Sequence, residues 1–330
     1  MGRGGDADAM PDEFSLIERL FDPLAGPEGL GLKDDAAVFT PRAGYDLVLT
    51  KDAIAEGRHY LSSDPPDTVA RKLLRVNLSD LAAKGATPRG YLLSCAWSVE
   101  TPLDWMQAFA DGLKDDQSEF GLALWGGDTI RVVGPSVFSL TAIGEVPSGN
   151  AVSRSGAAPG DDLWVTGTIG DAALGLLVAQ GEYAAEREDR AYLINRYRIP
   201  QPPVVFGKQL SRFASAALDV SDGLLGDLEH LCAASQVGAR VDRSAIPLSP
   251  VFKKCMASTE DSWRLVYGGG DDYQILFAAP REKQERVVDL ARAANVQVSC
   301  IGCLIEAQDV VVLDEAGQSI DVAPAGFSHF

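Results

Sequence analysis

The 330-residue sequence has few of the residues that build disulfide frameworks or zinc sites. Its five cysteines are an odd number without framework spacing, and it contains only three histidines. Cys300 and Cys303 lie three residues apart in a strand-like run, with no second pair or nearby histidine to complete a zinc site. This pattern is typical of a reducing compartment, so the sequence predicts a cytoplasmic protein.

Basic charge and long apolar runs are scarce as well. The 29 basic and 47 acidic residues give a net charge of −18, which argues against a nucleic-acid partner. No apolar run approaches the roughly 18–20 residues of a membrane span, so no membrane partner is predicted. Residues 1–11 are rich in Gly and Asp without an apolar segment, and are predicted to be a disordered leader rather than a secretory signal.

The common phosphate-binding loops are also absent from the sequence. There is no Gly-x4-Gly-Lys-Ser/Thr, and no Gly-x-Gly-x-x-Gly follows a strand. A nucleotide bound by this chain is therefore expected to be held through metal ions and acidic side chains.

Strand and helix patterns occur in both halves of the chain. This mixture predicts an α/β or α+β fold, between which periodicity does not choose. The length and 46% hydrophobic content suit two domains, and turn-rich stretches at 147–150 and 155–161 mark the seam between residues 12–150 and 151–330. Expected strands are 36–39, 45–50, 90–97, 122–125, 136–146, 163–166, 239–242, 274–277, 296–304 and 310–313. Expected helices are 14–21, 66–84, 101–119, 172–180, 182–198, 281–294 and one after Gly223.

Six short segments share one sequence pattern, in which a strand-like run ends in residues such as Asp, Ser, Thr and Gly. Any one of them reads as a turn or a helix N-cap, whereas six in one chain indicate a common role. Asp80 lies beside the apolar stripe of the helix that stops at Gly85, where a carboxylate needs a partner to offset its desolvation. The segments are Lys33–Ala36, Thr50–Asp52, Asn77–Asp80, Trp125–Thr129, Asp219–Gly223 and Gly268–Tyr273.

The chemistry of these segments suits a hard cation. Carboxylates and hydroxyls without His or Cys are the ligands of Mg2+ rather than zinc. The flanking glycines let the backbone approach a phosphate and expose N–H groups to it. The sequence therefore predicts a polyphosphate bridged to aspartates from both halves by several magnesium ions.

Taken together and in order, these segments resemble the thiamine-monophosphate kinase family, within the superfamily of aminoimidazole ribonucleotide synthetase. The resemblance includes Glu56-Gly-Arg-His-Tyr60 and runs from about Asp12 to the C-terminal Gly326-Phe-Ser-His-Phe330. It implies ATP-dependent phosphorylation of thiamine phosphate to thiamine diphosphate, the last step of thiamine diphosphate biosynthesis. It also implies a two-domain PurM-like fold and a homodimer, in which mixed N-terminal sheets pair into a barrel and each is followed by an α/β domain.

The resemblance also implies roles for individual residues. The metal ligands would be Asp35, Thr50, Lys51 (through its carbonyl), Asp52, Asp80, Asp128, Asp219 and Asp222. ATP would contact Gly127, Asp128, Arg154 and Ser221, and thiamine phosphate would contact His59, Asp271 and Phe327. The catalytic members would be Asp35, Asp80, Asp128 and Asp222.

Three residues depart from the family pattern, the first being Lys33, which replaces a common glycine beside the Asp34-Asp35 pair. Lys51 replaces the small or hydroxyl residue usual before Asp52, so only a backbone carbonyl could act as a ligand there. Asp271 stands where many members carry Glu, which alters the geometry of the thiamine phosphate contact by one methylene.

Two other readings of the sequence stay open. One is another ATP-using enzyme of the superfamily. Against it, no Cys precedes Cys95 as selenophosphate synthetases would require, and ribonucleotide synthetases lack the Gly-Gly-Asp-Asp-Tyr motif that ends at Tyr273. The other is a non-catalytic nucleotide- and metal-binding subunit, against which the intact set of acids speaks.

Overall fold

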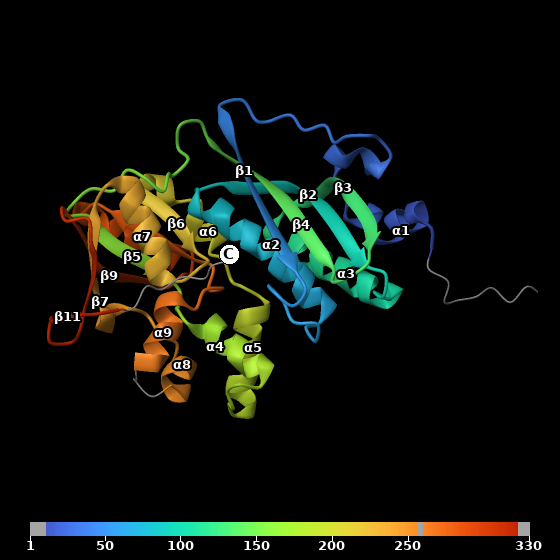
Figure 1. The fold of residues 1–330 in the computed structure, drawn as a ribbon. Coiled ribbons are helices and arrows are strands. Elements are labelled where there is room, and N and C mark those ends of the chain that lie inside the picture. Colours follow the sequence, from blue (N-terminus) through green and yellow to red (C-terminus); the bar gives the residue numbers. More distant parts are fainter. Residues whose placement is uncertain (1–10, 257–259, 323–330) are drawn as a thin grey trace, which may run out of the picture. The chain divides into compact units, whose positions relative to one another are not determined.

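A computed structural model describes residues 11–256 and 260–322 (Figure 1). The described chain forms two compact units. Unit 1 contains residues 11–40, 51–74 and 88–143, and unit 2 contains residues 41–50, 75–87 and 144–322. Residues 1–10 of the predicted leader and Phe327 lie outside the described residues. The predicted domain limits, 12–150 and 151–330, stay a prediction.

The first sheet has four strands in the order β1-β4-β2-β3. Strands β2 and β3 run parallel, with a shift in register next to Tyr91. The strands are β1 Tyr45–Ala55, β2 Thr87–Ser98, β3 Ala123–Val132 and β4 Val137–Pro147, and the helices of this part of the chain are α1 Glu13–Leu20, α2 Pro66–Ala83 and α3 Leu103–Phe120.

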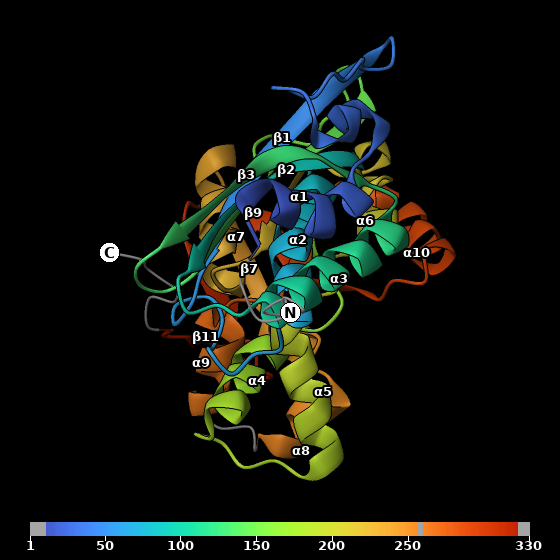
Figure 2. The same cartoon turned by 90° about the vertical axis from the view of Figure 1, so that its right-hand side faces the viewer.

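An aromatic cluster attaches α3 to this sheet. Phe109 of α3 packs against Phe138 of β4 and against the edge of Trp97 of β2, with ring centroids 4.5 and 5.4 Å apart. Trp105 stacks on Phe109 one turn away on the same face of α3. Figure 2 shows α1 beside α3, where Arg19 donates to the side chain of Gln107. Burial of Trp97, Phe109 and Phe138 stabilises the packing of α3 on the sheet.

Helix α2 begins and ends as its sequence predicts. Pro66 occupies the first position of the helix, where its missing N–H costs nothing. At the other end Gly85 has φ +78°, and Ala86 donates its N–H back to the carbonyl of Leu81. A glycine in this left-handed conformation is the usual helix stop. Asp80 is therefore held in the last turn of this helix.

The second sheet has seven strands in the order β11-β10-β7-β9-β5-β8-β6. The β10 and β7 strands are parallel, while the other neighbouring strands are antiparallel. The strands are β5 Asp162–Thr166, β6 Ala216–Val220, β7 Gly238–Asp242, β8 Gln274–Ala279, β9 Val298–Ile305, β10 Val310–Leu313 and β11 Ser319–Ile320.

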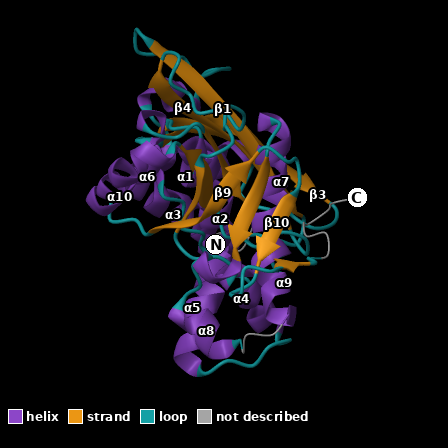
Figure 3. Ribbon diagram, turned by 90° about the vertical axis from the view of Figure 1, so that its left-hand side faces the viewer, coloured by secondary structure: helices purple, strands orange, loops and turns teal. Residues whose placement is uncertain are grey.

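Helices of unit 2 cover this sheet and enclose its apolar core. Figure 3 shows α4, α5, α8 and α9 gathered as one helical group. The core includes Leu163, Leu218, Leu228 and Leu276, all buried. The helices are α4 Asp171–Gln180, α5 Arg187–Arg198, α6 Val204–Gly207, α7 Leu224–Ser235, α8 Pro250–Cys255, α9 Glu260–Gly268 and α10 Gln284–Ala293.

The predicted two-domain α/β architecture is confirmed, with three local corrections. Residues 36–39 form no strand. Val38 of this segment donates its N–H to the carbonyl of Glu28 instead of to a neighbouring strand. Strands β1 and β3 continue beyond their predicted ends, so Asp52 and Asp128 lie within strands rather than after them. Helices α6, α8 and α9 were not predicted. Within the described range no helix has the length and apolarity to span a membrane.

Candidate active site

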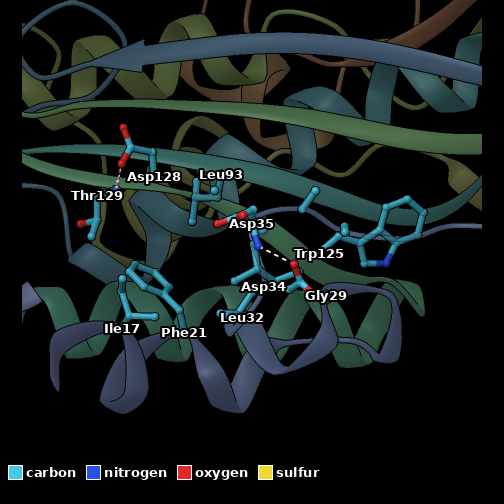
Figure 4. Close-up of a pocket in the computed structure, with 15 residues that line it drawn as sticks. Ile17, Phe21, Gly29, Leu32, Asp34, Asp35, Leu93, Trp125, Asp128 and Thr129 are labelled. Atoms are coloured by element: carbon cyan, nitrogen blue, oxygen red, sulfur yellow. Dashed lines mark hydrogen bonds between the residues drawn. The ribbon is translucent and has the colours of Figure 1, made fainter. Parts of the chain in front are cut away.

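A pocket in unit 1 collects three of the aspartates from the sequence motifs (Figure 4). Its cavity volume is about 140 Å³. Asp34, Asp35 and Asp128 lie at this pocket, and in Figure 4 Asp35 and Asp128 lie above the apolar side chains of Ile17 and Phe21. We call it the acidic pocket. Its mixture of carboxylates and apolar surface suits a ligand with a charged and an apolar part.

Close backbone packing shapes the acidic pocket. A Cβ on Gly29 would lie 2.9 Å from the carbonyl oxygen of Trp125, and one on Gly127 would lie 1.8 Å from that of Leu93. The ring of Trp125 stacks on Phe39, with centroids 4.6 Å apart. Because Gly29 has no side chain, the segment before Asp34 can pack directly on the backbone of Trp125. Because Gly127 has none, strand β3, which carries Asp128, can pack directly on the backbone of Leu93 in β2.

The acidic pocket is lined without basic side chains: among the described residues that line it there is no Lys, Arg or His. Asp34 accepts the N–H of Asp35 (2.8 Å), and Asp128 accepts that of Thr129 (2.9 Å), so each bond is to the adjacent residue. Three acids gathered without a cation are the arrangement that a divalent cation and its bound waters would neutralise.

A second group of predicted residues lies in unit 2 around Lys84. The Nζ of Lys84 donates to the carbonyl of Ala217 (2.8 Å) on β6, two residues before Asp219. Burial lowers the pKa of Lys84, as does Arg154, while Asp219 and Asp80 act in the opposite direction. These four charged groups therefore share one neighbourhood. Thr50 adds a hydroxyl to it by donating to the Asp80 carboxylate.

Two loops of unit 2 bring Ser221 and Asp271 together. Asp271 donates its N–H to the carbonyl of Ser221, and Tyr273 donates to that of Val220, both at 2.8 Å. A Cβ on Gly270 would lie 2.7 Å from the oxygen of Ser221, so only glycine allows this approach. We call these segments the Ser221 loop (219–223) and the Asp271 loop (268–273). The structure thus joins two segments that lie about 50 residues apart in the sequence.

Two buried carboxylates without a role in the sequence-based prediction attach these loops to neighbouring elements: Asp227 of α7 accepts from the Ser221 loop, and Asp272, which belongs to the Asp271 loop, accepts from the start of α4. Asp227, in the first turn of α7, accepts the N–H groups of Ser221 and Asp222 at 2.9 and 3.0 Å. Asp272 accepts the N–H of Gly170 at 2.7 Å. Burial raises the pKa of Asp227 to about 6 and that of Asp272 to about 7. In the sequence, Asp272 could have been noticed as the second acid of the Asp271-Asp272 pair, and Asp227 as an acid five residues after Asp222.

The remaining predicted residues lie along β1 and the turn that follows it. The ammonium group of Lys51 donates to Ser139 Oγ (2.7 Å), so its side chain is engaged on β4. Asp52 is half-buried in the strand. His59 Nδ1 accepts the N–H of Ala55 (3.1 Å), so in a neutral imidazole the proton is assigned to Nε2. His59 therefore has a donor nitrogen that suits a phosphate oxygen.

The predicted metal ligands do not form a ready-made cage. Across residues 11–256 and 260–322, no three His, Cys, Asp or Glu side chains lie close enough together to hold an ion by themselves. Magnesium does not need such a cage, because it is usually held by one or two carboxylates, several waters and the phosphates of a substrate. The donor chemistry fits Mg2+, and its ligand set stays a prediction.

Family models match most of the chain. Residues 33–146 match the model described as AIR synthase related protein, N-terminal domain, and residues 158–315 match that of the C-terminal domain. The thiamine-monophosphate kinase of Caulobacter vibrioides is 42% identical over 328 residues, covering 98% of this chain and 92% of that protein.

Solved structures agree with the sequence comparison. The crystal structure of thiamine-monophosphate kinase from Stenotrophomonas maltophilia K279a superimposes with a TM-score of 0.84 at 39% identity, covering 94% of this chain and 98% of that one. A structure described as AaThiL complexed with AMPPCP and TMP gives a TM-score of 0.78 at 29% identity, covering 96% and 97%. The family expected from the sequence motifs is confirmed: this chain belongs to the thiamine-monophosphate kinase family.

Proposed function

We propose that this protein transfers the γ-phosphoryl group of ATP to thiamine phosphate, giving ADP and thiamine diphosphate. The proposal is supported by the family, and by a relative that has been solved with AMPPCP and TMP. Within the chain, the observation that carries it is the direct bonding of the Asp271 loop to the Ser221 loop. One loop holds a residue expected to contact the phosphate acceptor, and the other holds a residue expected to contact the donor.

The reaction needs no nucleophile from the protein. A terminal oxygen of the phosphate of thiamine phosphate attacks the γ-phosphorus of ATP, and the bond from that phosphorus to the β–γ bridging oxygen breaks as ADP leaves. The acceptor oxygen is already anionic, so no strong general base is required. Catalysis then depends on alignment of the two substrates and on neutralisation of charge. The cysteine nearest to Asp128 agrees with this, because burial raises the pKa of the Cys95 thiol well above its ordinary value.

Aspartates of both units are proposed to hold magnesium. Bound Mg2+ would neutralise phosphate oxygens and polarise the γ-phosphoryl group. The proposed ligands are Asp35, Asp52 and Asp128 in unit 1, and Thr50, Asp80, Asp219 and Asp222 in unit 2, together with the carbonyl of Lys51.

Polar and cationic groups are proposed to hold the organic substrates. Gly127 offers backbone close to the acidic pocket, and the exposed Arg154 offers a guanidinium that suits a bidentate contact with ATP phosphates. His59 and Asp271 are proposed to bind thiamine phosphate. A carboxylate suits this role because it can pair with the cationic thiazolium ring, while the Nε2–H of neutral His59 suits a phosphate oxygen.

A homodimer in the cytoplasm is proposed as the working form. The support is an apolar surface on the first sheet, where Leu92 of β2 and Ile130 of β3 are 41% and 51% exposed and Val137 of β4 is 37% exposed. Exposed aliphatic residues on neighbouring strands are typical of a surface that another sheet covers. A second copy that pairs sheet to sheet would give the barrel that the resemblance implies.

Product analysis tests the proposed function. Purified protein is incubated with ATP and Mg2+ plus thiamine phosphate, free thiamine or an aminoimidazole ribonucleotide precursor, and thiamine diphosphate and ADP are measured by chromatography. Only thiamine phosphate should give ADP together with thiamine diphosphate, and EDTA should stop the reaction. Comparable ADP formation with the aminoimidazole precursor would indicate another reaction of the superfamily, and no ADP with any acceptor would indicate a non-catalytic subunit.

A further inference from the structure

Asp227 supports the Ser221 loop by hydrogen bonds to its backbone. Its side chain is 5% exposed, and one carboxylate oxygen accepts the N–H groups of both Ser221 and Asp222. Hydrogen bonds from backbone N–H groups to a buried carboxylate are stronger than those between neutral groups. Loss of this oxygen would leave two N–H donors of the loop without their partner, and the backbone would turn to find another.

Asp272 does the same for the Asp271 loop, through a different element. Its side chain is 2% exposed, and its two oxygens accept from Gly170 (2.7 Å) and from Ala172 (3.4 Å). These two residues form the beginning of α4, whose N-terminal N–H groups favour a carboxylate. Gln274 adds a contact, donating its side-chain amide to the carbonyl of Asp272 (3.3 Å). Asp272 thereby fixes the Asp271 loop to the start of a helix about 100 residues earlier in the chain.

Backbone conformation makes the position of Asp271 depend on this attachment. Gly270, Asp271 and Tyr273 have φ values of +70°, +63° and +49°. The left-handed conformation is costly for residues with a side chain, least so for Asp and Asn, and most of all for bulky residues such as Tyr. A loop with two such residues next to Asp272 needs bonds from the surrounding structure to keep this shape.

Charge around the two carboxylates agrees with positioning rather than with contact to a substrate. Asp272 is flanked by Asp171, and Arg196 offsets part of that negative charge. Asp171 is itself engaged by hydroxyl groups of Thr168 (2.6 Å) and Ser249 (2.6 Å). The carboxylate of Asp272 thus points into the protein, whereas Asp271, its neighbour in sequence, is half-buried.

We propose that Asp227 and Asp272 are paired positioning residues, Asp227 setting the Ser221 loop for ATP and Asp272 setting the Asp271 loop for thiamine phosphate. This inference rests on the proposed function, because it takes from it which loop serves which substrate. It adds that the two substrates are positioned by separable supports. Each support can then be weakened without equal damage to the other, although the loops share two backbone hydrogen bonds.

Steady-state kinetics on matched variants tests this proposal. Asp272→Asn and Asp227→Asn keep the size of the side chain but remove its negative charge and one of its two oxygens, so the hydrogen bonds from the N–H donors lose their charge assistance, and in Asp272, where both oxygens accept, one bond is lost. Asp161→Asn serves as the control, because Asp161 is a buried carboxylate (6% exposed) that accepts the N–H of Ala158 and the hydroxyl of Ser215, outside both loops. KM for each substrate is measured with the other substrate and Mg2+ saturating.

The expected result is a crossed pattern. Asp272→Asn should raise KM for thiamine phosphate about tenfold and change KM for ATP less than twofold, since one charge-assisted bond that attaches the Asp271 loop to the start of α4 is lost. Asp227→Asn should raise KM for ATP about tenfold and leave KM for thiamine phosphate within twofold. Asp161→Asn should change neither, and direct titration of thiamine phosphate into the Asp272 variant by calorimetry should reproduce its weakening.

Other outcomes overturn the proposal in recognisable ways. A parallel rise of both KM values in either variant, or no rise in folded protein, contradicts separable supports. If Asp272→Asn is not recovered folded, Asp272→Glu is measured for the same pattern. Failure of both to fold assigns the carboxylate to stability alone and also refutes the proposal. Wild-type protein without thiamine phosphate-dependent ADP formation would refute the proposed function instead, so the two failures are distinguishable.

Discussion

Gly127 should be irreplaceable, whereas its neighbour Gly126 should tolerate alanine. A Cβ on Gly127 would lie 1.8 Å from the carbonyl oxygen of Leu93, and 2.8 Å from its carbonyl carbon. Since ordinary contacts begin near 3.4 Å, strands β2 and β3 would have to separate locally by about 1.5 Å. A Cβ on Gly126 would meet nothing closer than the Leu92 side chain at 3.5 Å, which is an ordinary contact.

The size of the effect follows from what Gly127→Ala would have to displace. The clash is with backbone inside a strand ladder rather than with a flexible side chain, so a cost of about 3 kcal/mol is expected, the upper end for overpacking. That corresponds to a fall in Tm of roughly 6–24 °C, the range for units of 60–250 residues. The shift would move Asp128 by on the order of 1 Å, and misplacement of that size reduces catalysis by about 100-fold.

Differential scanning calorimetry and kcat/KM for ATP measure both effects in the two single variants. Gly126→Ala should keep Tm within about 2 °C of wild type, because its backbone is extended and alanine lowers the entropy of the unfolded chain. If Gly127→Ala melts and turns over like Gly126→Ala, then β2 and β3 do not pack as closely as described, and the reasoning about the Gly-Gly-Asp motif is refuted.

Three further predictions address other parts of the molecule. Asp80→Asn should lower turnover by about 100-fold or more with an unchanged circular dichroism spectrum, since its remaining oxygen can still accept from Thr50; full activity would remove Asp80 from the mechanism. In the second prediction, Asp272→Asn should remove the part of the pH dependence of unfolding free energy that comes from titration of the Asp272 carboxyl group. Burial raises the pKa of Asp272 from 3.8 to about 7, so the folded protein holds this proton more tightly than the unfolded chain does. Its contribution to stability is therefore largest in acid and is lost as the pH rises to about 7. The difference in unfolding free energy between wild type and Asp272→Asn should change by about 2 kcal/mol between about pH 5.5 and pH 8 in thermal melts, and a constant difference would contradict the raised pKa. Ile130→Asp should convert a dimer to monomers in analytical ultracentrifugation, because it places a charge on an exposed apolar surface, whereas an unchanged dimer would exclude that surface as the interface.

Local signals in the sequence were sufficient to predict most helices and strands. Helix α2 was predicted from a proline at its start and Gly85 at its end, and both residues act as such signals predict. Five strands of the second half (β5, β7, β8, β9 and β10) were predicted too, because buried strands there are short apolar runs such as β8. Strands β6 and β11 and helices α6, α8 and α9 were not predicted. The predicted features depend on residues within one turn or one strand, so a single sequence contains them.

Asp52 and Asp128 show where local reading fails. Acids in short Gly-Gly-Asp and Thr-Lys-Asp segments look like the ends of strands, and so β1 and β3 were expected to end too early. Strand β3 continues because alternate residues face solvent, where a carboxylate costs little; Asp128 is exposed, while Thr129 is buried. In β1, Asp52 is half-buried on the side of the buried Ile54, so its burial is not explained by this alternation. These two acids of the predicted site are thus carried by strand interiors, a rigid base that the turn interpretation would not provide.

Asp271 and Asp272 show a second limit, since the sequence makes the two acids of the pair equivalent. The structure separates them through partners that no local pattern contains. The N–H of Gly170 lies about 100 residues before Asp272, and the carbonyl of Ser221 that receives the N–H of Asp271 lies 50 residues before it. The two acids also differ in burial, since Asp272 is buried against the start of α4 and Asp271 is half-buried. The acid proposed to bind substrate thus lies next to a buried acid, and substitutions at the two positions should differ in kind: loss of the Asp271 carboxylate should remove a contact with substrate, while loss of the Asp272 carboxylate should move one.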